Sequence, residues 1–256
     1  MISNVPTLFQ SRDALLVVFV LFLVALFSLS GMLAPAPDHS PSLGEFMRDH
    51  KKRYSQHDEE LLIRYFFQDK RDGVFLDVGC AWPIRNSTTF YLEQHLNWSG
   101  VAVDALEEYG DAWALNRPRS TFLNYAVSDR SGGTITFYRG SGTGVSSMYE
   151  EHTVERSPKP PVPVEVEVKS LNDLLETAGV LAIDFMSMDI EGAEPLALAG
   201  FDIERFAPKL VCVEGRWSQE NAPAIREYFE SHGYELMDEY NRYEKANWYF
   251  RKIPTK

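Results

Sequence analysis

Residues 73–96 read GVFLDVGCAWPIRNSTTFYLEQHL, and this stretch decides the fold. The apolar run Val74–Leu76 is typical of a buried strand, Asp77 and Gly79 end it, and a helical pattern begins near Ser87. A strand, a tight turn and a helix bring a nucleotide-like ligand to the end of a parallel sheet. Glycine lets the turn pass close to a ligand, and the free backbone N–H groups at the helix start can face it. A single glycine is equally compatible with an ordinary strand-to-helix turn of any α/β protein.

A second apolar run, VAVD, ends in Asp104. In dinucleotide sites an acid at the end of the second strand, roughly 20 residues past the glycine turn, bonds the ribose hydroxyls. Asp104 is placed for that role, although it could also cap the helix expected over residues 107–116. A third strand is expected over residues 121–127, with Ser128 and Asp129 at its end.

The stretch DFMSMDIEGAE, residues 184–194, is the second informative segment. Its strand-like run is followed by the acids Asp189, Glu191 and Glu194, with Gly192 between the last two. Acids at the carboxyl end of a central parallel strand lie where such sheets hold ligands. The alternative is that they only charge and cap the start of the next helix. Two acids suffice for capping, so the third acid favours a site.

Residues 14–33, ALLVVFVLFLVALFSLSGML, carry no charged side chain. About 20 helical residues at ~1.5 Å each give roughly 30 Å, the thickness of a bilayer core. We therefore predict a transmembrane helix that follows a short tail, residues 1–13. A cleaved signal peptide is the alternative, with residues 34–36 as its cleavage site. A proline-rich tether and basic segment, residues 34–54, then leads to one globular domain, residues 55–256.

The basic side chains are uneven around that apolar segment. Only Arg12 precedes it, whereas Arg48 and the run 51–53 follow it. The positive-inside rule then predicts a single-pass membrane protein whose domain faces the cytoplasm. Unpaired Cys80 and Cys212 agree with a reducing compartment.

Composition excludes several classes of protein. The net charge of −12 repels phosphate backbones, so nucleic acid is not an expected partner. Two cysteines in separate apolar contexts do not make a disulfide framework. The acids of residues 184–194 leave a bound divalent cation open as an alternative, but no histidine adjoins them in sequence and no metal ligand is assigned. The loops over residues 140–147 and 157–163 are each candidate lids.

Several motifs carry a resemblance to a known family. FLDVG with the following NSTT, then VAVDA, NYAVSD, VKSLNDLL and above all SMDIEGAE, resemble the FkbM-type methyltransferases in the same order, from about Ser55 onward. The resemblance implies a class I methyltransferase fold. This is a Rossmann-like, doubly wound, mostly parallel sheet with an antiparallel C-terminal hairpin near residues 234–237 and 247–251. It also implies S-adenosylmethionine as methyl donor and usually a hydroxyl as acceptor.

The same resemblance carries over residue by residue. It matches Asp77 and Gly79 to the cofactor loop, in which Cys80, Asn86 and Ser87 also fall. It further matches Asp104 to the ribose-binding acid, Ser128 and Asp129 to the adenine end, and Asp189 and Glu191 to the acids beside the transferred methyl group.

Methyl transfer from a sulfonium is a direct displacement that mainly requires alignment, and a carboxylate that takes the hydroxyl proton adds typically ~10²–10⁴-fold. Asp189 is the first candidate for that base and Glu191 the second. Two positions depart from the family pattern: Pro83 stands where a second glycine is usual, and Ser187 replaces a frequent lysine.

The leading interpretation is a membrane-anchored O-methyltransferase that acts on a sugar, a lipid-linked glycan or a natural product. The alternative is a non-catalytic membrane protein that uses a methyltransferase-like domain for binding, which Pro83 favours because proline removes an N–H and fixes φ. A nicotinamide dehydrogenase would need a fuller Gly-x-Gly-x-x-Gly turn after Gly79.

Overall fold

The computed structural model describes residues 41–142, 144–215 and 220–254. The chain divides into two compact units, Met1–Ser42 and Leu43–Lys256, and the second carries the fold described below. The prediction of a single-pass membrane protein is corrected here, because no helix within the described ranges is long and apolar enough to cross a bilayer. The apolar segment on which that prediction rested, residues 14–33, lies outside those ranges, as does the tail before it.

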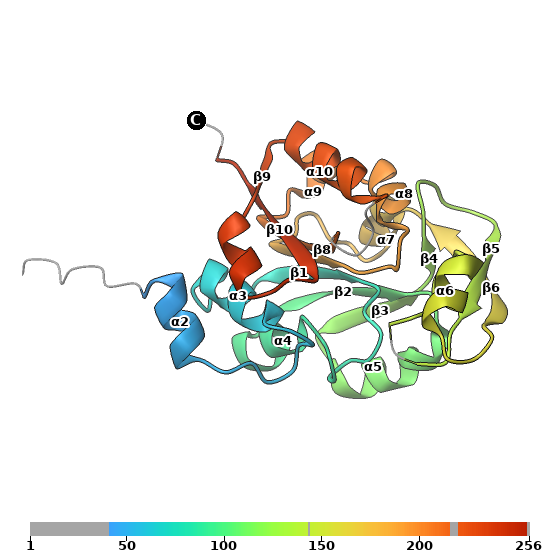
Figure 1. Ribbon diagram of the computed structural model, residues 1–256, viewed down its shortest axis with the longest axis horizontal. Helices are drawn as coiled ribbons and strands as arrows, with labels where there is room; N and C mark the ends of the chain where they lie inside the picture. Colours follow the sequence, from blue (N-terminus) through green and yellow to red (C-terminus); the bar gives the residue numbers. More distant parts are fainter. Residues whose placement is uncertain (1–40, 143, 216–219, 255–256) are drawn as a thin grey trace, which may run out of the picture. The chain divides into compact units, whose positions relative to one another are not determined.

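A seven-stranded sheet in the order β3-β2-β1-β7-β8-β10-β9 forms the centre of the unit (Figure 1). The first five strands in this order pair in parallel with one another, whereas β10 runs antiparallel to both of its neighbours. The predicted Rossmann-like, mostly parallel sheet with an antiparallel C-terminal strand is thus confirmed. The strands are β1 Val74–Val78, β2 Ser99–Asp104, β3 Ser120–Asn124, β7 Phe185–Met188, β8 Leu210–Glu214, β9 Tyr234–Leu236 and β10 Asn247–Lys252.

The strand order reverses beside β1. From β1 the chain builds β2 and β3 on one side, and it later returns to place β7 and β8 on the other. In an open parallel sheet this topological switch leaves a crevice at the carboxyl ends of the strands, because the connecting helices diverge to opposite faces. The site should therefore lie where β1 and β7 end.

Helices cover both faces of the sheet because its central strands are buried on both sides. On β1, Leu76 and Val78 pack into the apolar cluster beneath α7, α8, α9 and α10, whereas Phe75 packs into the cluster of α3 and α4 on the opposite face. Figure 1 shows the two layers. The helices are α2 Leu43–Asp49, α3 Glu59–Phe67, α4 Phe90–Leu96, η1 Glu107–Tyr109, α5 Gly110–Asn116, α6 Glu150–Arg156, α7 Leu171–Thr177, α8 Glu194–Ala199, α9 Ile203–Phe206, α10 Ala222–Ser231 and η2 Asp238–Arg242.

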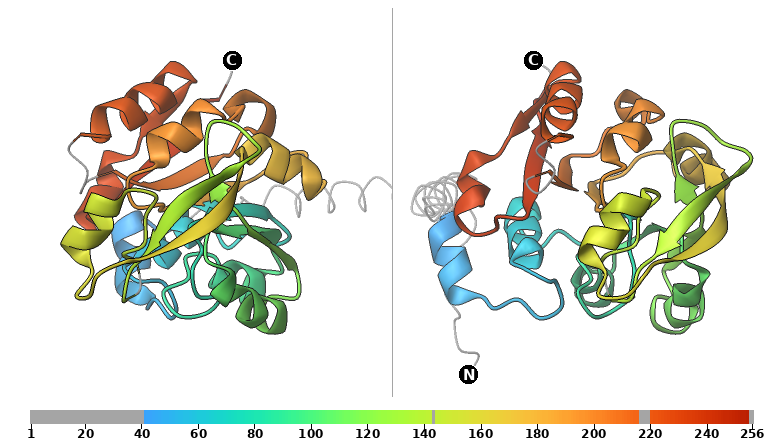
Figure 2. Two further views of the ribbon diagram at one scale, coloured as in Figure 1. Left: turned by 90° about the vertical axis from the view of Figure 1, so that its right-hand side faces the viewer. Right: turned by 45° about the vertical axis from the view of Figure 1, so that its right-hand side comes forward.

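A small second sheet, in the order β4-β6-β5, stands beside the main one. It consists of β4 Ala126–Val127, β5 Thr134–Arg139 and β6 Val162–Lys169. The excursion between β5 and β6 contains the two loops expected as lids, and α6 lies between them and packs against β5 (Figure 2). This places α6, and not only loops, near the switch point.

Candidate active site

A cavity of about 500 Å³ opens at the carboxyl ends of the parallel strands. Its walls come from the ends of β1, β2, β7 and β8, from the segment before α3, and from the β5–α6 excursion. A cavity of this size suits a drug-sized ligand, and its position agrees with the switch-point rule.

The glycine at the end of β1 is required by the neighbouring strand. Gly79 has φ +80°, and a Cβ built there would lie 1.8 Å from the backbone oxygen of Asp189. Its N–H donates to the carbonyl of Val103 at 2.9 Å. From the sequence, this glycine was predicted to let the turn pass close to a ligand. In the structure its most immediate effect is to let the ends of β1 and β7 meet.

Asp77 and Asp104 lie on the cavity wall at the ends of β1 and β2. Asp77 is buried, its Oδ2 accepts a 2.6 Å hydrogen bond from the Thr89 hydroxyl, and burial raises its pKa. Asp104 accepts the N–H groups of Ala81 and Leu106, both at 2.9 Å, and burial raises its pKa to about 6. Asp104 therefore fastens the turn after β1 and the chain entering η1 while it faces the cavity.

Three acids meet where β7 and β8 end. One oxygen from each of Asp189, Glu194 and Glu214 lies within 4.8 Å of the others. Asp189 is open to the cavity but surrounded by protein, and burial together with the charges of Glu214 and Glu194 raises its pKa well above the usual value. Burial and the like charge of Glu191 raise the pKa of Glu214 to about 7. Such a cluster favours sharing a proton or binding a cation.

Glu194 also has the capping role that the alternative interpretation gave to these acids. It is buried, and its Oε1 accepts the N–H of Ile190 at 2.9 Å. Asp189, by contrast, faces the cavity.

Glu191 turns toward the β5–α6 excursion. It has φ +53°, and its Oε2 lies 2.7 Å from His152 Nε2 and 2.6 Å from Arg156 Nη1. The hydroxyl of Ser147 donates to the Glu191 carbonyl at 2.8 Å. Burial and the charge of Asp189 raise the pKa of Glu191 to about 8, although Arg156 opposes that shift. Glu191 thus ties α6 to the site.

The structure brings most of the sequence-predicted site residues together. The cavity is lined by Asp77, Gly79, Cys80, Asn86, Asp104, Asp189 and Glu191. Three other predicted residues, Ser87, Ser128 and Asp129, are not among those that line it. The Oγ of Ser87 accepts the N–H of Phe90 at 3.1 Å and so caps α4. Ser128 and Asp129 bond to each other at 2.9 Å just beyond β4.

Sequence reasoning missed several residues of the cavity wall. Arg156 is one, and the spacing of His152 and Arg156 in EEHTVER, one helical turn apart, was the available signal. Glu214, at the end of β8, is another. Gln56, Glu59 and Asn247 come from the two ends of the unit, and no local pattern connects them.

The two departures from the family pattern differ in their placement. Pro83 is buried and is not among the residues that line the cavity, whereas Ser187 is one of them. The proline therefore shapes the turn after β1 from behind without facing the cavity.

Comparison with known proteins identifies the family. The model of the Methyltransferase FkbM domain matches residues 71–236, and the chain belongs to this family. The family is one of methyltransferases, and S-adenosylmethionine is the cofactor that membership of it implies. Asp77, Gly79, Asp104 and Asp189, with the cavity between them, supply a crevice and hydrogen-bond acceptors that fit such a nucleoside cofactor.

One curated relative and two solved structures indicate the breadth of the similarity. The chain is 32% identical over 92 residues to the 2-O-methyltransferase NoeI of Sinorhizobium fredii (strain NBRC 101917 / NGR234), a match that covers 32% of this chain and 37% of that relative. A TehB-like SAM-dependent methyltransferase from Corynebacterium glutamicum aligns with TM-score 0.42 and 14% identity over 85% of this chain and 100% of its own. A SAM-dependent O-methyltransferase from Thermotoga maritima aligns with TM-score 0.43 and 10% identity over 84% of this chain and 73% of its own.

Proposed function

We propose that the protein methylates a hydroxyl group of an uncharged acceptor, such as a sugar, a glycan or a natural-product alcohol. S-adenosylmethionine supplies an already activated methyl group. The observation that carries the proposal is the position of Asp189, which is open to the cavity and in backbone contact with the Gly79 turn. A carboxylate there can accept the proton of an acceptor hydroxyl at the point where the strand order reverses.

The two acids at the ends of β2 and β7 are proposed to have different roles. Asp104 at the end of β2 is proposed to accept hydrogen bonds from the ribose hydroxyls, and Asp189 at the end of β7 is proposed to serve the acceptor. The end of β1 lies between them. Burial and the neighbouring acids raise the pKa of Asp189, which supports its role as a base because a more basic carboxylate holds a transferred proton more strongly.

The charge of the acceptor region supports an uncharged acceptor. Four acids, Glu59, Asp189, Glu191 and Glu214, line this part of the cavity, and Arg156 is a basic side chain among them. Above about pH 8, where Glu191 and Glu214 are ionised, a phosphate or carboxylate on the acceptor would be repelled by these acids. The relative NoeI is named a 2-O-methyltransferase, and this name agrees with methyl transfer to oxygen.

Two variants of the full-length protein test the proposal. Asp104→Ala should weaken binding of S-adenosylmethionine by ~1.5–3 kcal/mol, the worth of hydrogen bonds to a charged group. Asp189→Asn should leave that affinity nearly unchanged and lower turnover with any accepted hydroxyl compound by ~10²–10⁴. Titration calorimetry gives the first quantity, and release of S-adenosylhomocysteine gives the second.

A capping residue away from the cavity provides the control. Asp202 accepts the N–H of Arg205 at 3.1 Å at the start of α9. Asp202→Ala should lower the free energy of unfolding by about 1 kcal/mol and leave cofactor affinity unchanged. If Asp104→Ala behaves like this control and Asp189→Asn retains full turnover, the assignment is wrong.

A further inference from the structure

One wall of the cavity is an irregular segment that needs support. The loop from Gly79 to Thr89 joins β1 to α4, and Gly79, Cys80, Ala81, Trp82, Arg85, Asn86 and Thr88 all line the cavity. This loop belongs to no helix or strand, and its backbone contacts are isolated ones, such as the bridge from Asn86 to Ser55 and the bond from the Cys80 N–H to the Val103 carbonyl. Loop backbone without regular structure keeps one conformation only when other groups bind its polar atoms.

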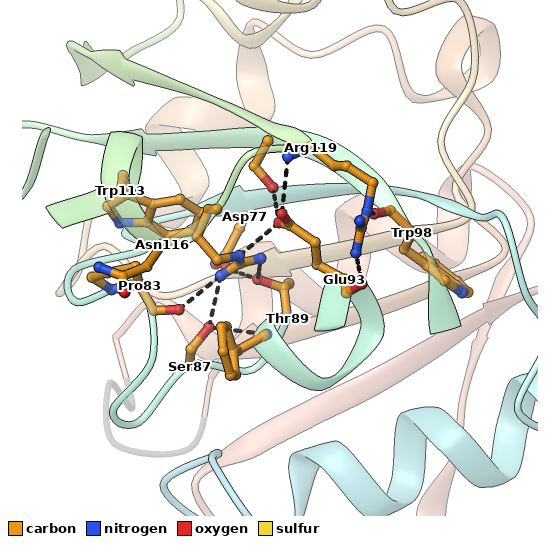
Figure 3. A network of polar contacts seen from close by, with 12 residues as sticks. Asp77, Pro83, Ser87, Thr89, Glu93, Trp98, Trp113, Asn116 and Arg119 are labelled. Atoms are coloured by element: carbon orange, nitrogen blue, oxygen red, sulfur yellow. Dashed lines mark hydrogen bonds and ion pairs between the residues drawn. The ribbon is translucent and has the colours of Figure 1, made fainter. Parts of the chain in front are cut away.

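A buried arginine, Arg117, donates to three points of this loop, and Figure 3 labels these partners, Pro83, Ser87 and Thr89. Arg117 directly follows α5, and its side chain is fully buried. Its Nη1 donates to the carbonyl of Pro83 at 2.9 Å and to the Ser87 hydroxyl at 3.3 Å, and its Nη2 donates to Thr89 Oγ1 at 3.0 Å. Its Nε donates to the carboxylate of Glu93 at 2.6 Å, which neutralises the charge.

The third contact continues to the cavity itself. The hydroxyl of Thr89, fully buried, accepts from Arg117 and donates to Asp77 Oδ2 at 2.6 Å. A single hydroxyl therefore separates the guanidinium from the carboxylate at the end of β1. This relay fixes both the rotamer of Asp77 and the direction from which it faces the cavity.

The network is more specific than stability requires. Replacing a buried ion pair by apolar residues of similar volume is often neutral or stabilising, so the pair alone is weak evidence of a stabilising role. Here four of the five guanidinium donors have partners at defined points, and the ring of Trp113 lies 4.3 Å from the guanidinium carbon. Trp113 also donates to the carbonyl of Ala81 at 2.7 Å, so α5 holds the first half of the loop as well.

We propose that Arg117 is a positioning residue for the cofactor: through Thr89 it holds the Asp77 carboxylate toward the positively charged methionyl end of S-adenosylmethionine. The inference rests on the proposed function, in which the ribose lies at Asp104 and the methyl group near Asp189. Asp77 ends the strand between those two acids, so it is the carboxylate nearest to the part of the cofactor that joins them.

The experiment compares two ligands that differ at that end. S-adenosylmethionine carries the ammonium and sulfonium charges, whereas 5′-methylthioadenosine keeps the adenosine and lacks the amino-acid part. Titration calorimetry on the full-length protein measures both affinities for wild type, Arg117→Met and Thr89→Val. Thermal unfolding of each variant is measured alongside, because a purely structural role changes the melting temperature without distinguishing the ligands.

Both variants should weaken binding of S-adenosylmethionine by about tenfold or more, the effect of losing a hydrogen bond to a charged group. Both should change binding of 5′-methylthioadenosine by less than about threefold, because the bonds that hold Asp104 remain. Arg119→Met is the matched control, because the Arg119 side chain also bonds to Glu93, at its carbonyl, and its other side-chain bond goes to the carbonyl of Trp98 and not to the loop. It should leave both affinities unchanged.

Equal losses for the two ligands, or a lowered melting temperature with both affinities intact, would overturn the positioning role. If Arg117→Met does not fold, Thr89→Val alone decides, because it removes one hydroxyl and leaves the contacts of Arg117 with Glu93, Pro83 and Ser87 in place. Absence of S-adenosylmethionine binding by the wild-type protein would instead count against the proposed function.

Discussion

Substitution of Gly79 by alanine should damage both the stability and the alignment of the site. A Cβ at this position would lie 1.8 Å from the oxygen and 2.8 Å from the carbonyl carbon of Asp189. The Asp189 backbone would have to retreat by more than ~1 Å before ordinary van der Waals distances were restored. The positive φ of +80° adds about 1–2 kcal/mol for any residue with a Cβ.

A second glycine separates these two effects. Gly133 has φ +77°, and a Cβ there would meet nothing within 4 Å. Gly133→Ala should therefore lose only the conformational part, about 1–2 kcal/mol, whereas Gly79→Ala should lose at least about 1 kcal/mol more from the clash with β7. Urea unfolding monitored by circular dichroism measures both values.

The clash also predicts a loss of activity in the folded fraction. Moving the end of β7 by about 1 Å displaces Asp189, and a misplacement of that size can lower turnover by ~10²-fold. Gly133→Ala should keep wild-type turnover because Gly133 is not among the residues that line the cavity. Equal stability losses in the two variants would refute the reasoning that the approach of Asp189 requires this glycine.

Two further predictions concern the acids of the acceptor region. Burial and like charge raise the folded-state pKa of Glu214 from 4.5 to about 7, so between these pH values the folded protein holds a proton that the unfolded chain has lost. The free energy of unfolding should consequently fall as pH rises through this window. In urea unfolding, Glu214→Gln should be more stable than wild type by about 1 kcal/mol at pH 8, but not at pH 4. The control is Glu235→Gln, at an exposed ion pair with Arg251, which should show no such difference between the two pH values. Equal stabilities of wild type and Glu214→Gln at pH 8 would contradict the raised pKa of Glu214. The second prediction concerns the acceptor. Above about pH 8, where Glu191 and Glu214 are ionised, kcat/KM at low salt should be at least about tenfold higher for a neutral alcohol than for its phosphorylated counterpart, and equal values would rule out charge exclusion.

The part of the site that follows from parallel strands could be predicted from the sequence. Asp77, Asp104 and Asp189 each end an apolar run, and the carboxyl ends of parallel strands meet at one edge of the sheet. Strand order was the remaining unknown, and the family resemblance supplied it. These three side chains accordingly line one cavity in the structure.

The rest of the site depends on contacts between distant segments that leave no local pattern. Arg156 reaches Glu191 because α6 is inserted between β5 and β6, in residues between the two predicted loops for which the sequence predicted no helix. Arg117 supports the cofactor loop through the carbonyl of Pro83, an atom that every residue type carries. Sequence periodicity reports which face of an element is buried, but it does not report which distant backbone atom a buried side chain binds.

A crystal structure of the full-length protein with S-adenosylhomocysteine tests the central claim most directly. The account predicts that the ligand occupies the cavity at the ends of β1, β2 and β7, with its ribose hydroxyls bonded to Asp104, its amino group facing Asp77 and its sulfur directed toward Asp189. A ligand bound outside this cavity, or with its sulfur directed away from Asp189, would contradict it.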